Sequence, residues 1–305
     1  MDIYMKLKED LLHRCPSLEV REEEPMSRHT SFRIGGPARL MALPKSEEEA
    51  IAAVDCAARL GIQPFFMGNG SNLLVADQGY EGFIVKAAGG LDALERVGET
   101  GIRAGSGVLL SRLAVFAREN GLTGLEFAHG IPGTVGGAVT MNAGAYGGEM
   151  KDVVVSTRVL NADGTVEEVR GEAQDFSYRH SAFSDEKRLI LSAEYTLKLG
   201  DPAAIQAQMD ELAQRRRFKQ PLDVPSAGST FKRPEGYYAA ALIDECGLKG
   251  KKVGGAQVSI RHAGFVVNQG GATCADVLAL VELVRETVLR EAGVALELEV
   301  RTLGV

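Results

Sequence analysis

The sequence GLEFAHGIPGTVGGAVTMNAGAYGG, from Gly124 to Gly148, is the stretch from which the rest of the chain is interpreted. It contains eight glycines, separated by apolar residues such as Ile131, Val135 and Val139. Glycine loses the most backbone entropy on folding, so this density is costly unless the backbone has to approach a ligand closely. The stretch predicts buried loops whose amide groups point at an anion such as a pyrophosphate. Tight turns between short buried strands explain the same glycines, and the stretch alone leaves both interpretations open.

A second glycine loop, GNGSNLLV, runs from Gly68 to Val75 and follows a segment that is typical of a strand. It resembles a phosphate-binding turn. It is not the dinucleotide fingerprint, because Leu73 stands where that motif needs its third glycine. Taken alone, the loop is a weak signal, and ordinary turn chemistry explains it better. Two such loops in one region favour a ligand with two phosphates, since a dinucleotide needs several backbone donors.

Composition excludes several classes of function. The formal net charge of −7 argues against a surface that coats nucleic acid. No apolar run approaches the length of a membrane span. Charged residues such as Lys6, Lys8 and Glu9 occur where a signal peptide needs an apolar core, so we expect a cytoplasmic protein. The cysteines and histidines are scattered, which predicts buried free thiols and no metal site.

Periodicity and capping signals predict alternating helices and strands. We expect helices over 1–20, 46–60, 108–120, 238–245 and 273–291, and another that starts at Pro202 and ends in the basic stretch 215–221. We expect strands over 63–66, 83–85, 101–104, 189–199, 264–268 and 296–300, and a hairpin over 153–169 that turns at Asp163-Gly164. Ser46 with Glu49, and Thr273 with Asp276, have the spacing of capping boxes. The sequence Gly200-Asp201-Pro202 predicts a domain boundary, with residues 1–200 in one domain and 201–305 in the other.

Seven short motifs, taken together and in order, resemble the UDP-N-acetylenolpyruvoylglucosamine reductase family, the flavin enzymes of peptidoglycan precursor synthesis. They extend over nearly the whole chain, and none is decisive alone. The motifs are TSFRIGGP (30–37), GNGSNLL (68–74), GIPGTVGGA (130–138), MNAGA (141–145), YRHS (178–181), AGSTFK (227–232) and LELEVR (296–301).

The resemblance implies an α+β fold. A two-subdomain FAD-binding unit of the PCMH/vanillyl-alcohol-oxidase type would occupy the first domain, after the N-terminal helix, and a smaller α+β substrate domain would follow. FAD would be bound non-covalently, with NADPH as the reductant and a UDP-sugar nucleotide as the substrate. Neither nucleic acid nor membrane insertion is implied. The cofactor-binding residues implied by the motifs are Gly68, Asn69, Gly70, Ser71, Asn72, Leu73, Pro132, Gly133, Thr134, Gly136, Gly137, Asn142, Ala143 and Gly144.

The resemblance also implies which residues act on the substrate. Reduction of the enolpyruvyl ether develops negative charge beside a carboxylate, and Arg179 matches the family arginine that would hold it. Ser229 matches the proton donor to C2, and Glu299 matches the catalytic glutamate that would stabilise the enol. Tyr178 and Lys219 match substrate-binding residues. On spacing alone, a surface ion pair, a turn serine and an exposed strand face would explain Arg179, Ser229 and Glu299.

Two alternative functions are a flavin oxidase and a non-catalytic binding module. A flavin oxidase of related fold could hold FAD covalently through His129, which stands where a small residue is expected. A nucleotide-sugar binding module would lack catalysis. The short spacing between Tyr178 and Ser229 is typical of the compact form of the family, which lacks the inserted loop whose tyrosine closes over the substrate.

Overall fold

The chain folds into two units whose segments alternate along the sequence. The computed structural model describes residues 2–185 and 187–305. The first unit contains Met1–Glu22, Leu40–Asn69 and Gly82–Arg215, and the second contains Glu23–Arg39, Gly70–Glu81 and Arg216–Val305. The chain therefore enters the second unit twice before residue 82. The domain boundary expected after residue 200 stays a prediction.

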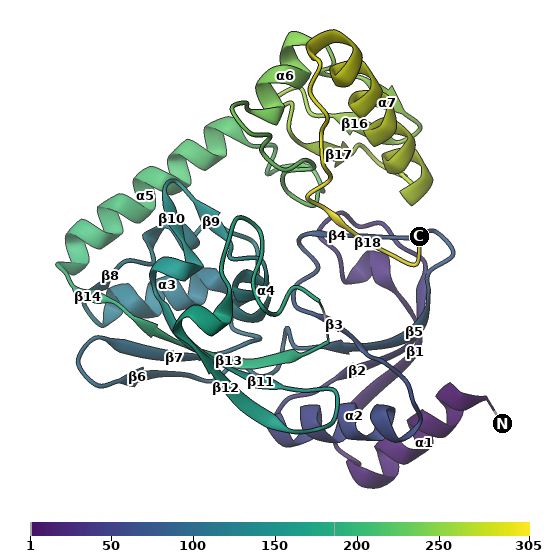
Figure 1. Ribbon diagram of the computed structural model, residues 1–305, viewed down its shortest axis with the longest axis vertical. Coiled ribbons are helices and arrows are strands. Elements are labelled where there is room, and N and C mark those ends of the chain that lie inside the picture. Colours follow the sequence, from purple (N-terminus) through teal and green to yellow (C-terminus); the bar gives the residue numbers. More distant parts are fainter. Residues whose placement is uncertain (1, 186) are drawn as a thin grey trace. The chain divides into compact units, whose positions relative to one another are not determined.

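The first unit is built on an antiparallel five-stranded sheet in the order β12-β11-β13-β7-β6 (Figure 1). Its strands are β6 (Leu94–Val97), β7 (Gly101–Gly105), β11 (Val154–Leu160), β12 (Val166–Arg170) and β13 (Leu189–Thr196). The predicted hairpin is confirmed, because β11 pairs with β12 and Gly164 N–H bonds the Asn161 carbonyl at 3.0 Å. Helices α3 (Leu110–Glu119) and α4 (Val135–Thr140) share a core with this sheet that includes Leu113, Val139 and Tyr195.

A second sheet has the order β1-β2-β5-β3. It is formed by β1 (Glu19–Pro25), β2 (Pro37–Leu43), β3 (Phe65–Met67) and β5 (Tyr80–Lys86). Helices α1 (Ile3–Arg14) and α2 (Glu47–Arg59) bury Leu7, Leu11 and Val54 in a core shared with Leu40 and Phe83. Because β1, β2 and β5 each cross from one unit's residues to the other's, the sheet also carries the chain between the units.

In the second unit, α6 (Ala239–Glu245) and α7 (Cys274–Ala292) pack with the sheet β15-β16-β17. The strands are β15 (Lys252–Val253), β16 (Ala256–Val258) and β17 (Val266–Asn268). Strand β18 (Arg301–Leu303) pairs in parallel with β4 (Leu73–Val75), which comes from the second glycine loop. The longest helices begin as predicted, since Thr273 and Asp276 form a complete capping box on α7 and Asp201 accepts bonds from the first turn of α5 (Pro202–Lys219).

The remaining elements are short. They are the 3₁₀ turns η1 (Met26–Arg28), η2 (Glu126–Ala128), η3 (Met150–Asp152) and η4 (Gly171–Gln174), and the strands β8 (Leu122–Thr123), β9 (Gly144–Ala145), β10 (Gly148–Glu149) and β14 (Lys198–Leu199). All four cysteines are free thiols, as predicted, but only Cys56 and Cys274 are buried, whereas Cys15 and Cys246 are partly exposed. Among the described residues, no helix has the length and apolar character needed to cross a membrane.

Three predictions about elements were wrong. The N-terminal helix expected over 1–20 ends at Arg14, and residues 19–20 already belong to strand β1. Residues 296–300 form no strand, because Leu298 makes only an isolated bridge to Phe231, and the last strand begins at Arg301 instead. The stretch from Gly124 to Gly148 is not made of loops alone. Residues 135–140 form the helix α4 in spite of Gly136 and Gly137, because its buried residues Val135, Ala138 and Val139 pack into the first core.

Candidate active site

The loop from Gly68 to Ser71 offers several backbone donors. Within the part of the chain that the structure describes, the amides of Gly68, Asn69, Gly70 and Ser71 donate no hydrogen bond. The Asn69 side chain bonds the Pro132 carbonyl at 3.3 Å, which joins this loop to the loop before α4. Amides without a partner in the protein are available to an anion.

Thr134, at the end of the loop before α4, carries a buried hydroxyl without a partner among the described residues. The residue is 1% exposed, and its Oγ1 makes no hydrogen bond among the described residues. A Cβ added at Gly68 would overlap this oxygen, so only glycine allows the two loops to approach each other there. A Cβ at Gly137 would meet only Thr134 Oγ1, at 3.8 Å, so the space in front of Gly137 is open.

At two other glycines of the stretch, Gly136 and Gly144, packing within the protein leaves no room for a side chain. A Cβ at Gly136 would lie 2.9 Å from the Ser106 Cβ, and Gly136 N–H bonds the Ser106 carbonyl at 2.9 Å. A Cβ at Gly144 would lie 2.7 Å from the Glu149 Cγ, across the β9–β10 hairpin. Packing alone therefore requires glycine at these two positions, so they are no evidence for a ligand.

Tyr178 and Arg179 form the tip of a tight turn. Ser177 and His180 exchange backbone hydrogen bonds of 3.1 and 3.2 Å on either side of it. Arg179 has a φ of +56°, which is uncommon for a residue other than glycine. Its guanidinium carbon lies 5.0 Å from the centroid of the Tyr178 ring, and Tyr178 is 47% exposed. Strained residues of this kind cluster at functional sites, so the turn is a candidate binding element.

Ser229 and Glu299 lie on neighbouring segments of the second unit. Glu299 N–H bonds the carbonyl of Thr230 at 2.8 Å, and Lys232 N–H bonds the carbonyl of Glu297 at 2.9 Å. Asn72, in the glycine loop 68–75, also holds the backbone around Glu299. Its side chain donates to the Glu299 carbonyl at 3.1 Å, and its own carbonyl accepts from Arg301 N–H at 3.0 Å. Thr230 anchors the arrangement, being 2% exposed with its Oγ1 accepting from Val266 N–H.

Lys219 and two histidines differ in their surroundings. Lys219 is the last residue of α5 and is exposed. Burial lowers the pKa of His262, and the charges of Lys249 and Lys219 lower it further, so a neutral imidazole stands near Lys219. Burial also lowers the pKa of His129, which keeps this imidazole neutral at physiological pH.

A cavity of about 1020 Å³ lies in the first unit, over the β12-β11-β13-β7-β6 sheet. Its charged lining is largely paired internally, as in the contacts Arg103–Glu194 and Arg158–Glu47. None of the residues expected to bind cofactor or substrate lines it. The cavity therefore gives no support for a ligand site, and the glycine loops remain the candidate.

The predicted site residues belong to both units. Residues 68–69, 132–144 and 178–179 lie in the first unit, and residues 70–73, 219, 229 and 299 lie in the second. Sequence reasoning missed Glu149, whose carboxylate is 3.1 Å from the Asn142 amide. The hairpin that brings them together turns at Tyr146-Gly147, both with positive φ, and a Tyr-Gly pair is a weak turn signal.

Comparisons with known proteins agree with one another. A family model described as "FAD binding domain" matches residues 38–170, and one described as "UDP-N-acetylenolpyruvoylglucosamine reductase, C-terminal domain" matches residues 220–303. A curated UDP-N-acetylenolpyruvoylglucosamine reductase from Clostridioides difficile is 45% identical over 99% of this chain and 98% of its own. One from Agathobacter rectalis is 47% identical over 95% of this chain and 96% of its own.

A solved structure also resembles the fold. The crystal structure of UDP-N-acetylenolpyruvylglucosamine reductase from Thermus caldophilus aligns with a TM-score of 0.79 and 36% identity. The alignment covers 94% of this chain and 98% of that one.

Proposed function

The chain belongs to the UDP-N-acetylenolpyruvoylglucosamine reductase family, and from this we propose that Arg179, Ser229 and Glu299 carry its reaction. The protein is an FAD-containing oxidoreductase with an α+β fold. It reduces UDP-N-acetylenolpyruvoylglucosamine with NADPH in peptidoglycan precursor synthesis. The three residue roles, the cofactor contacts and a cytoplasmic location are the parts that we propose.

The glycine loops fit the proposed cofactor. The unbonded amides of residues 68–71 suit a pyrophosphate, and the buried Thr134 hydroxyl lacks a partner that a ligand or an ordered water would supply. The open space at Gly137 leaves room for a group to approach the backbone. When bound, FAD carries hydride from NADPH to the substrate, while the protein supplies position and charge.

Arg179 is proposed to bind the carboxylate next to the developing enolate. A guanidinium matches a carboxylate with parallel N–H bonds, and such charge-assisted bonds are about twice as strong as neutral ones. Support comes from the turn, which holds Arg179 at positive φ with an exposed aromatic neighbour. Tyr178 is proposed to pack on the substrate.

Ser229 is proposed to donate the proton to C2, with Glu299 sharing a proton with the enol. The observation that carries this assignment is the 2.8 Å bond from Glu299 N–H to the Thr230 carbonyl, because it brings the backbone next to Ser229 against Glu299. A serine hydroxyl is a weak acid, so a cation is needed to favour its ionised form. Lys219 is proposed to bind the sugar nucleotide and to supply that charge.

The function is tested by a visible spectrum of the purified protein. We expect a flavin spectrum that NADPH bleaches and that the enolpyruvyl nucleotide restores. A colourless protein would favour the binding module, and bleaching without recovery on adding the nucleotide would contradict the reductase assignment.

Precipitation with trichloroacetic acid tests the mode of attachment. We expect the yellow colour in the supernatant, because we propose that FAD is bound non-covalently. A yellow pellet would indicate the flavin-oxidase type of linkage.

A further inference from the structure

Arg33 lies in a tight turn of the second unit and has a backbone conformation that is uncommon for an arginine. Its φ is +57°, and among the described residues the only other basic residue with a positive φ is Arg179. Phe32 and Ile34 are 1% and 3% exposed, so both neighbours are buried while Arg33 itself is exposed. A conformation of this kind persists only where the surrounding structure fixes it, and such residues cluster at functional sites.

Hydrogen bonds fix this turn from within and from strand β17. Arg33 N–H bonds the Thr30 carbonyl at 3.1 Å, and Thr30 Oγ1 donates to the Ile34 carbonyl at 3.0 Å across the turn. Asn268 of β17, which is 8% exposed, donates from its Nδ2 to the Phe32 carbonyl at 3.1 Å. The backbone that carries Arg33 is therefore held in one arrangement before any ligand binds.

The turn also contacts two segments of the proposed site. Ser31 N–H bonds the Gly70 carbonyl at 3.2 Å, and Ser31 Oγ donates to the Ser226 carbonyl at 2.7 Å. Within the part of the chain that the structure describes, the amides of Gly70 and Ser71 donate no hydrogen bond. Ser229 follows three residues after Ser226. The turn therefore connects the glycine loop with the segment of the proposed proton donor.

The Arg33 guanidinium has no partner in residues 2–185 and 187–305, where it makes neither a hydrogen bond nor an ion pair. By contrast, Arg285 pairs with Glu282 and Arg290 pairs with Glu291 in the same unit. A guanidinium is always charged, and its planar fork of N–H groups matches the oxygens of a phosphate. An unpaired fork on a fixed turn is therefore available to an anionic ligand.

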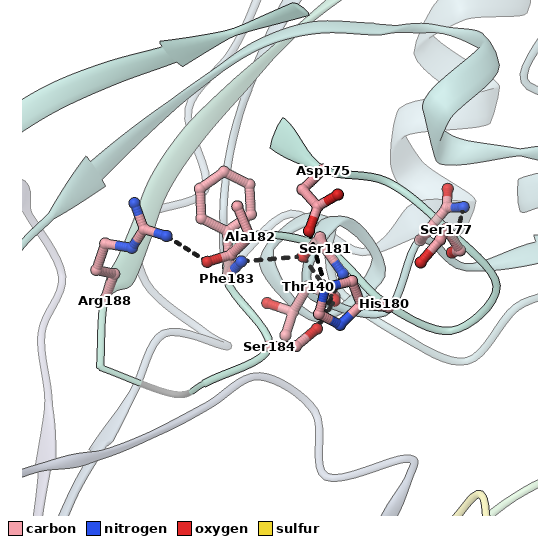
Figure 2. A network of polar contacts seen from close by, with 10 residues as sticks. Thr140, Asp175, Ser177, His180, Ser181, Ala182, Phe183, Ser184 and Arg188 are labelled. Atoms are coloured by element: carbon pink, nitrogen blue, oxygen red, sulfur yellow. Dashed lines mark hydrogen bonds and ion pairs between the residues drawn. The ribbon is translucent and has the colours of Figure 1, made fainter. Parts of the chain in front are cut away.

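The Arg179 turn of the first unit is fixed by the same kind of contact. Beside it, Ser181 Oγ donates to the Thr140 carbonyl at 2.8 Å, as Figure 2 shows. In both turns a serine hydroxyl bonds a backbone carbonyl of a neighbouring segment, and an arginine is held at positive φ. Because Arg179 is proposed to bind a carboxylate, this likeness favours an anion-binding role for Arg33.

We propose that Arg33 is a ligand-binding residue whose guanidinium binds the diphosphate of a nucleotide next to Gly70 and Ser71. The inference rests on the proposed role of the glycine loop in cofactor binding. FAD, NADPH and the UDP-sugar substrate each contain a diphosphate, so the three share this chemistry and the experiment separates them. Because the turn is fixed in advance, less conformational freedom is lost when the diphosphate binds.

Arg33→Gln tests the proposal, because it removes the charge and keeps most of the length of the side chain. Three dissociation constants are measured on the purified holoenzyme. The constant for FAD comes from the recovery of flavin fluorescence on dilution, that for NADPH from the concentration dependence of bleaching, and that for the enolpyruvyl nucleotide from the concentration dependence of reoxidation. We expect at least one constant to rise by roughly ten- to a hundredfold, the scale of one contact to a charged group. The nucleotide whose constant rises is the one that Arg33 binds.

Two further variants and a matched control separate binding from folding. Arg33→Lys keeps the charge but lacks the fork, so its constant should rise less. Arg33→Gly removes the side chain but relieves the strain, because glycine adopts positive φ readily. We expect its Tm to be at or above that of the wild type, together with the same loss of affinity. Arg290→Gln, the control, removes an exposed charge from the last turn of α7 in the same unit and should leave all three constants unchanged.

Unchanged constants in both Arg33→Gln and Arg33→Gly would overturn the inference and leave Arg33 as a turn residue. An equal rise in Arg290→Gln would also overturn it, because the effect would then reflect net charge alone. A wild-type protein that bound no flavin would instead contradict the proposed function on which the inference rests.

Discussion

The physical constraint that favours glycine differs between positions of the central stretch 124–148. At Gly144 an added Cβ would lie 2.7 Å from the Glu149 Cγ, so the fold itself excludes a side chain. At Gly137 the nearest atom to an added Cβ is Thr134 Oγ1, at 3.8 Å, so a small side chain fits the protein. A test of cofactor contact therefore belongs at Gly137.

We expect Gly137→Val to fold and to lose FAD, because its side chain would occupy the open space that we assign to the cofactor. Gly137→Ala is the matched control and should bind FAD with a smaller loss. Flavin absorbance per protein and the circular dichroism spectrum measure the two properties. If a folded Gly137→Val protein still bound stoichiometric FAD, the assignment of Gly137 and helix α4 to the cofactor site would be wrong.

Ser229→Ala tests the proton donor. We expect FAD binding and reduction by NADPH to remain nearly normal, while reoxidation by the enolpyruvyl nucleotide slows by about two to four orders of magnitude. Ser229→Cys should lose much less, because it keeps a proton at nearly the same place. Rapid mixing of the reduced enzyme with substrate gives the rates. Near-normal reoxidation in Ser229→Ala would move the proton donor elsewhere, with Glu299 as the first candidate.

At the scale of elements, the sequence was enough to predict the helices and the hairpin that have strong apolar periodicity and clear capping or turn residues. The helices α2, α3 and α7 and the β11–β12 hairpin follow from apolar spacing, capping residues and the Asp163-Gly164 turn. The alternation at 296–300 misled, because Leu296 and Val300 are buried by packing in the second core, and the backbone bonds of this stretch to Thr230 and Lys232 do not extend into a strand ladder. Glycine propensity hid α4, whose buried face decides its conformation.

The candidate site was less predictable than the fold. Glycine spacing indicated an anion site, but Arg179, Ser229 and Glu299 were singled out only by the family resemblance. Asn142 and Glu149 meet through a hairpin, and Ser229 and Glu299 meet through a bridge between segments about 70 residues apart, as Phe231 and Leu298 show. Neither pairing leaves a signal in a single sequence, because each depends on tertiary packing.

Helix α7 carries a pH-dependent stability. Bonds from Thr273 N–H and Gly255 N–H lower the pKa of Asp276 below its ordinary 3.8. A carboxyl whose pKa is lower in the folded than in the unfolded protein stabilises the fold at any pH above its unfolded-state pKa. That stabilisation is lost as the pH falls through its folded-state pKa. We expect Asp276→Asn to lower Tm near neutral pH, with the difference from wild type shrinking below about pH 4.

Thermal melts at a series of pH values, followed by circular dichroism, measure this difference. Glu235→Gln is the matched control, because it removes an exposed charge from the same unit. A deficit in Asp276→Asn that stays constant down to about pH 3 would show that the helix cap does not depend on the ionised carboxylate.

At the scale of the whole molecule, the second unit is assembled from three separate parts of the sequence. Its core includes Phe32 (1% exposed), Ile34 (3%) and Leu74 (1%), which come long before the predicted boundary at residue 200. Strand β4, also from the early part of the chain, is the partner of β18. Residues 201–305 therefore lack part of the core and sheet of the unit to which most of them belong.

Cutting the gene at this boundary tests whether the two parts fold alone. Burying each missing side chain contributes about 1.5–3 kcal/mol, and three of them amount to a large share of a typical domain stability of about 5–15 kcal/mol. We expect the 201–305 fragment to unfold without a cooperative transition, and co-expression of 1–200 with 201–305 to restore a soluble protein that binds FAD. A full-length protein cut after folding, at a protease site inserted between Gly200 and Asp201, is the control and should keep its Tm, since both cores remain complete. A sharp melting transition in the isolated 201–305 fragment, close to that of the full chain, would instead show that residues 23–39 and 70–81 are dispensable to the second unit.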